Sequence, residues 1–119
     1  MIFDFKTFKK VAYKAYKQLP DSAYGFSFNE MMDIFHRYFD LYERTFNEVH
    51  PPINTKQIQR LMCKMRYFDN DGVPFEFEYE EYAPIIEQHF KTQYYNCDYN
   101  INHFFSGKIR ALRFYEVCY

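Results

Sequence analysis

The stretch NTKQIQRLMCKMRYFDNDGVPFEFEYEEY, residues 54–82, contains the sharpest changes of pattern and charge in the chain. Apolar residues at helical spacing over residues 55–66 predict a short helix that begins after the capping residue Asn54. A polar Asp-Asn-Asp-Gly turn follows, and apolar and polar side chains then alternate over residues 73–79, which is typical of a half-buried strand. The stretch therefore predicts a helix followed by a small antiparallel β-hairpin at about residues 65–79.

Two longer helices are expected before this stretch. Residues 4–19 place apolar side chains on one face and a row of lysines on the opposite face. Residues 29–47 have the strongest helical periodicity in the chain, and they follow a capping box formed by Ser27 and Glu30. Because its apolar stripe is long and aromatic, we expect this second helix to form the centre of the core.

Helical patterns return after the hairpin. One helix is expected at about residues 83–95, and helical spacing continues over residues 99–117, with Leu112 among its inward residues. Gly107 leaves open whether that last segment is one helix or two. The expected fold is mainly α, with about five helices and one small hairpin, in a compact single domain over residues 1–119.

The composition indicates an aromatic-rich domain without disulfides. The chain has 15 Phe, 13 Tyr and no Trp, more rings than a small core is expected to bury, and exposed Tyr is favoured at interfaces. Three widely spaced cysteines, Cys63, Cys97 and Cys118, suit free thiols in a reducing compartment. No apolar run approaches the about 20 residues needed to span a bilayer. We therefore expect a cytoplasmic protein with no membrane partner.

The net charge of −1 hides strong local imbalance. Residues 4–19 have a net charge of +4, and residues 55–66 have the same. Residues 69–81 have a net charge of −6. The chain as a whole is therefore not a general nucleic-acid binder, although single elements have the charge for a polyanionic or a basic partner.

Metal sites find little support in the spacing of possible ligands. Asp69, Asp71, Gly72 and Glu78 match four positions of the calcium-binding helix–loop–helix motif, but Tyr67 occupies the first ligand position and a strand replaces the second helix. Four side chains could supply zinc ligands without any paired spacing: His89, Cys97, His103 and Cys118. We predict no metal and no other cofactor.

No catalytic signature is present either. A thiol enzyme needs a cysteine activated by a histidine, and neither Cys63 nor Cys97 lies in such a sequence context. Glu76 and Glu78 share one face of the predicted strand, but a solvated edge strand explains them without acid–base chemistry. The chain has three glycines, too dispersed for a phosphate-binding loop. We therefore expect a protein that is not an enzyme.

The order helix, break, helix, hairpin resembles that of a winged helix-turn-helix. The resemblance implies a DNA-binding regulator in which the helix at 55–66 enters the major groove. Its candidate contacts are Lys56, Gln57, Arg60 and Lys64, with Lys6, Lys10 and Lys14 adding contacts to the phosphate backbone. The chain departs from this pattern in its wing, because the hairpin is strongly acidic and would repel phosphates.

The charge layout fits a protein-binding module better. The acidic edge consists of Asp69, Asp71, Glu76, Glu78, Glu80 and Glu81. Such an edge could mimic phosphates toward a basic or nucleic-acid-binding protein, or add a strand to its partner. The small size and the composition, rich in Phe, Tyr, Asn and Lys, resemble small accessory proteins of phages and plasmids. We therefore predict a non-enzymatic inhibitor or regulator of a nucleic-acid-handling host protein, with DNA binding through the 55–66 helix as the alternative.

Overall fold

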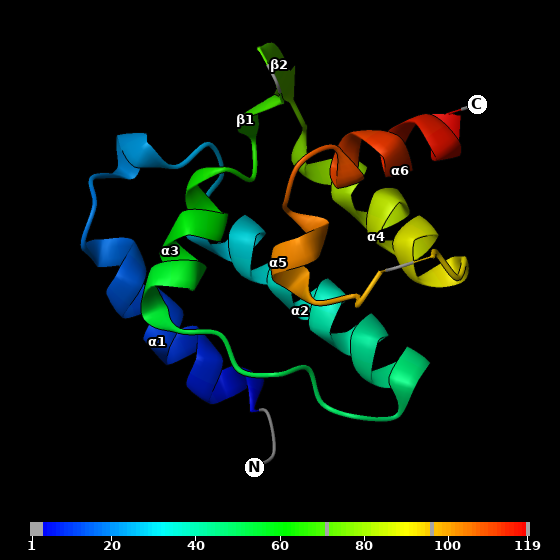
Figure 1. The fold of residues 1–119 in the computed structure, drawn as a ribbon. Helices are drawn as coiled ribbons and strands as arrows, with labels where there is room; N and C mark the ends of the chain where they lie inside the picture. The colour runs from blue at the N-terminus through cyan, green and yellow to red at the C-terminus, as the bar shows by residue number, and fades with distance from the viewer. Residues whose placement is uncertain (1–3, 71, 96, 119) are drawn as a thin grey trace.

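The computed structural model describes residues 4–70, 72–95 and 97–118 (Figure 1). Within these residues there are six α-helices, two 3₁₀-helices and two antiparallel strands. In chain order they are α1 (Phe5–Lys17), η1 (Asp21–Ala23), α2 (Phe28–Phe46), α3 (Thr55–Cys63), β1 (Tyr67–Asn70), β2 (Val73–Glu76), η2 (Tyr79–Glu81), α4 (Tyr82–Lys91), α5 (Ile101–Phe104) and α6 (Ile109–Cys118). This confirms the prediction of a mainly α fold with one small hairpin. No helix among the described residues is both long enough and apolar enough to cross a membrane.

Helix α2 lies at the centre of the core, as its periodicity predicts. The capping box at its N-terminus is present, with Ser27 Oγ accepting from the Glu30 amide at 3.1 Å and Glu30 Oε1 accepting from the Ser27 amide at 2.9 Å. Its buried stripe consists of Met31, Met32, Ile34, Phe35, Tyr38, Phe39 and Tyr42. Helices α1 and α4 pack against α2, and they are in turn covered by α3 and α6 (Figure 1).

Helix α3 begins where the sequence predicts but ends earlier. Asn54 and Gln57 form a second capping box at its start. The predicted helix over 55–66 is too long, because α3 ends at Cys63. The next carbonyls receive side-chain donors in place of helical amides: Arg110 Nη1 donates to the Lys64 oxygen at 2.7 Å, and the Tyr82 hydroxyl donates to the Met65 oxygen. These contacts end the helix and direct the chain into β1.

The hairpin is shorter than the alternating pattern suggests. Strand β2 ends at Glu76, and residues 79–81 form the 3₁₀-helix η2 instead of continuing the strand. Phe68 pairs with Phe75 across the strands, their rings stacked 5.3 Å apart. Val73, which the pattern places inward, is 54% exposed because the tip of the hairpin projects beyond the helices (Figure 1).

The C-terminal segment forms two helices, and Gly107 separates α5 from α6 with a φ of +49°. Such a backbone conformation favours glycine. The prediction that Leu112 faces inward is wrong, since its side chain is 46% exposed. Arg110 and Arg113 are buried instead, together with Ala111. The register of α6 therefore places two cations on its inward face.

Helix α4 ends at Lys91, four residues before the predicted end near residue 95. The Tyr99 hydroxyl explains the early end, because it donates to the Thr92 oxygen at 2.7 Å and accepts from the Tyr94 amide at 2.9 Å. These hydrogen bonds take the place of the backbone bonds that would continue the helix. They attach the segment after α4 to Tyr99.

Candidate binding surfaces

The exposed face of α1 is the most basic element of the structure. It carries five lysines, Lys6, Lys9, Lys10, Lys14 and Lys17, and all five are exposed. With Tyr13 and Phe28 they form what we call the lysine surface. Lys6, Lys9, Lys10, Tyr13, Lys14 and Phe28 line a shallow hollow of about 610 Å³ on it.

The local sequence explains why this face stays positive. No acidic residue lies within α1, and the one carboxylate at its start, Asp4, accepts from the Lys6 amide and from the Thr7 hydroxyl. None of the five lysines forms an ion pair with a described residue. The charge of the lysine surface is therefore available to a partner.

Aromatic rings form the floor between these lysines. Tyr13 is 47% exposed, and its ring meets Phe28 edge-on at 5.3 Å. The ammonium of Lys17 lies 5.4 Å from the Tyr13 ring. An exposed aromatic surface next to flexible cations can contact an apolar side chain while the lysines contact neighbouring acids.

The predicted recognition helix, α3, has fewer free polar groups than its sequence suggests. Gln57 caps the helix through Oε1, and the Gln59 amide donates to the Ala15 oxygen on α1 and to Gln18, which follows α1. Burial, with the nearby Arg110, lowers the pKa of Lys64. The exposed cations left on this helix are Lys56 and Arg60.

Hydrogen bonds within the chain engage much of the predicted acidic edge. Asp69 Oδ1 accepts from the Gly72 amide at 2.7 Å, and Glu81 Oε1 accepts from the Glu78 amide at 3.2 Å. Glu80 is exposed. Asp71, also assigned to this edge, lies outside the described residues.

Arg66, assigned from sequence to the basic helix, instead neutralises part of the acidic edge. Its guanidinium contacts Glu76 Oε1 at 3.0 Å and Glu78 Oε1 at 3.7 Å, and Nη1 donates to the Gly25 oxygen at 3.2 Å. The two ion pairs with Arg66 hold the carboxylates of Glu76 and Glu78 in place and reduce the net negative charge of the acidic edge.

A buried histidine and a cysteine lie close together, but not in the arrangement of a catalytic pair. His89 Nδ1 accepts from Arg113 Nε at 3.1 Å. Because arginine can only donate, the proton of this imidazole lies on Nε2, 3.8 Å from Cys97 Sγ. His89 therefore cannot take the proton of the thiol as a general base would.

The pKa values at this pair agree with that geometry. Burial, followed by the nearby Arg113 and His103, lowers the pKa of His89 to about 3. Burial raises the pKa of the Cys97 thiol. A thiol that stays protonated beside a histidine that stays neutral is not an activated nucleophile. Among the described residues, no three His, Cys, Asp or Glu side chains are grouped closely enough to bind a metal ion.

The structure groups some predicted contacts and separates others. Lys6, Lys10 and Lys14 lie together, whereas neither the α3 cations nor the acidic edge lines the same hollow. Sequence reasoning missed Tyr13, although it lies four residues after Lys9 and therefore on the same helix face. It also missed Phe28, which no spacing signals because it comes from another helix.

Comparisons with protein-family models, with curated proteins and with solved structures found no match to this chain.

Proposed function

We propose that the protein is a non-catalytic protein-binding module and that its lysine surface binds an acidic segment of a partner protein. The observation behind this proposal is the hollow of about 610 Å³, which is lined by Tyr13, Phe28 and four lysines of α1 that form no ion pair with a described residue.

The aromatic floor favours a protein partner over a nucleic acid. A duplex would use the lysines for its phosphates and leave Tyr13 and Phe28 without a matching group. An acidic amphipathic segment would use both, with carboxylates on the lysines and an apolar side chain on the rings. The two glutamines of α3 are engaged within the protein, which weakens the alternative of a DNA-binding α3.

The acidic edge gives the same module a second surface of opposite charge. Glu76, Glu78 and Glu80 are exposed, and Tyr67, which pairs with Glu76 across the hairpin, is 57% exposed. Such a surface suits a basic, nucleic-acid-handling protein. A module with these two surfaces would act by occupying its partner, as expected of a small phage- or plasmid-type accessory protein that inhibits or regulates a host protein.

The proposal is tested by titrating three probes of equal charge and mapping the chemical shifts by NMR. The first probe is an acidic peptide with one Phe and one Leu, the second is the same peptide with Ser at both positions, and the third is an oligothymidine. We expect the first to bind most tightly and to shift Tyr13 and Phe28. Tightest binding of the oligothymidine, or shifts confined to α3, would contradict the proposal.

A further inference from the structure

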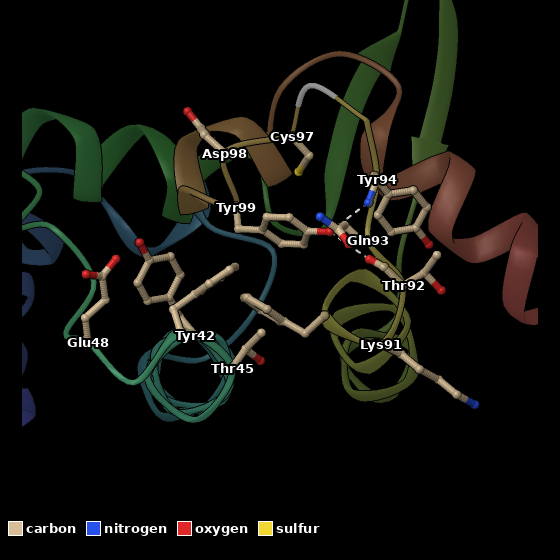
Figure 2. Close-up of a pocket in the computed structure, with 12 residues that line it drawn as sticks. Tyr42, Thr45, Glu48, Lys91, Thr92, Gln93, Tyr94, Cys97, Asp98 and Tyr99 are labelled. Carbon is tan, nitrogen blue, oxygen red and sulfur yellow. Dashed lines mark hydrogen bonds between the residues drawn. The ribbon is translucent and has the colours of Figure 1, made fainter.

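A pocket of about 480 Å³ lies far along the chain from the lysine surface, and the proposed function does not use it. It opens between the C-terminal end of α2, the end of α4 and residues 92–94 and 97–99 (Figure 2). Its volume is within the range of about 300–1,000 Å³ that small-molecule sites occupy in proteins.

Five aromatic residues line this pocket, and four of them contact one another and form one wall: Tyr42, Phe46, Phe90 and Tyr99. Phe46 is central, with its ring 4.8 Å from that of Tyr42 and 5.2 Å from that of Tyr99. Phe46 is also 39% exposed, so one side of this wall faces the opening. Aromatic faces carry partial negative charge and attract cations.

Carboxylates add negative charge at the same opening. Glu48 and Asp98 both line the pocket. Burial raises the pKa of Tyr42, and the charges of Glu48 and Asp98 raise it further, so both carboxylates act on that hydroxyl. Glu48 forms no ion pair with a described residue. The cation that lines the pocket, Lys91, extends away from the rings (Figure 2).

The pocket is formed before any ligand binds, because Tyr99 is fixed from both ends. Its carbonyl accepts from the buried Tyr38 hydroxyl at 2.6 Å, and its own hydroxyl bonds to Thr92 and Tyr94. Its ring lies 5.7 Å from that of Phe90. A wall that needs no rearrangement costs little conformational entropy when a ligand enters.

We propose that this pocket binds a compact organic cation, a guanidinium or an alkylammonium head group, against the aromatic wall, with the nearby negative charges of Glu48 and Asp98 adding to the attraction. The head group can belong to a small molecule or to a modified or basic side chain of a protein, and both present the same chemistry to the pocket. The site shares no residue with the lysine surface, so a test of cation binding here and a test of the proposed function have independent outcomes.

The test is an NMR titration of the full chain with methylguanidinium and with tetramethylammonium. The matched neutral probes are methylurea and tert-butanol. We expect saturable shifts of the Tyr42, Phe46 and Tyr99 ring signals with the cations, and binding at least about tenfold weaker for the neutral probes. Equal binding of the neutral probes, or no saturable shift with either cation, would overturn the proposal.

Variants separate the two parts of the site. The double variant Glu48→Gln with Asp98→Asn removes both carboxylate charges and is expected to weaken cation binding about tenfold. Phe46→Leu removes one aromatic face and is expected to weaken it about threefold. The new side chains are similar in size to those they replace. Glu87→Gln is the control, since it removes one exposed carboxylate on α4 that does not line the pocket. An unchanged affinity in the double variant would contradict the role of the carboxylates.

A peptide arm distinguishes the two sources of the head group. A short peptide with one trimethyllysine is compared with free tetramethylammonium. Tighter binding of the peptide by about tenfold or more indicates a protein side chain, and equal binding indicates a small molecule. Failure of both probes contradicts the cation site.

Discussion

Arg110 is a buried cation that no carboxylate neutralises among the described residues. It is 1% exposed, and its guanidinium lies 3.8 Å from the Phe68 ring and 4.6 Å from the Phe105 ring. Nη1 donates to the Tyr82 hydroxyl at 2.9 Å as well as to the Lys64 carbonyl. Burial lowers its pKa. This one side chain therefore connects the hairpin, the end of α3 and α4.

Replacing Arg110 tests that connecting role. Arg110→Ala is expected to lower the free energy of unfolding by about 3 kcal/mol or more, because it leaves a cavity and removes both hydrogen bonds. Arg110→Met is expected to cost less, since its side chain fills part of the volume and packs well on rings. Urea unfolding of the three proteins measures both differences. An Arg110→Ala variant as stable as the wild type would contradict this role.

His89 makes stability depend on pH. In the folded protein its pKa is lowered to about 3, whereas the unfolded chain keeps the ordinary value of 6.5. Below pH 6.5 the unfolded chain therefore takes up a proton that the folded protein does not accept until about pH 3. Stability from this group is complete above pH 6.5 and falls toward pH 3, by up to about 5 kcal/mol.

The variant His89→Gln isolates this contribution because a glutamine oxygen can still accept from Arg113. We expect its free energy of unfolding to fall less steeply between pH 6.5 and pH 4 than that of the wild type. Denaturant unfolding at a series of pH values provides the comparison. Parallel curves for the two proteins would show that His89 does not titrate as the structure implies.

At the scale of elements, the attachment of the hairpin depends on Gly25. A Cβ added at Gly25 would lie 2.4 Å from Arg66 Cβ and 2.8 Å from Arg66 Cδ. Arg66 Cβ is next to the backbone and cannot move away without shifting the start of β1. Gly25→Ala should therefore displace Arg66 from Glu76 and loosen the hairpin.

We expect Gly25→Ala to cost about 1–3 kcal/mol and to shift the amide signals of β1 and β2. Gly72→Ala is the control at the hairpin tip, where the added methyl has open space and the φ of +83° is the source of its cost. We expect Gly72→Ala to lower the free energy of unfolding by about 1–2 kcal/mol and to leave the position of Arg66 unchanged. If both variants leave the Arg66 and Glu76 signals unchanged, the close packing at Gly25 is wrong.

Element types could be predicted from sequence, whereas several element ends could not. The caps at Ser27 and Asn54 act over three residues and were readable locally. The ends of α3 and α4 are set by Arg110, Tyr82 and Tyr99, which are distant in sequence. The register of α6 was misread because a buried arginine contradicts the usual preference for apolar residues inside.

At the scale of the whole molecule, the sequence predicted part of the candidate site. The lysine row of α1 follows from helical periodicity, so Lys6, Lys10 and Lys14 were readable. The partial neutralisation of the acidic edge was not, because Arg66 reaches Glu76 and Glu78 only after the chain turns into the hairpin. The aromatic pocket was not predictable from sequence either, because its rings come from α2, α4 and the segment after α4 and share no sequence motif.

The most direct test of the proposed function compares two charge reversals that change the net charge equally. One is Lys10→Glu with Lys14→Glu on the lysine surface, and the other is Lys56→Glu with Arg60→Glu on α3. The probe for both is the acidic peptide with Phe and Leu, and calorimetric titration measures its affinity. We expect the α1 pair to weaken binding at least about tenfold, or about 1.4 kcal/mol, and the α3 pair to change it by less than about threefold. Equal losses in the two variants, or a larger loss in the α3 pair, would contradict the account.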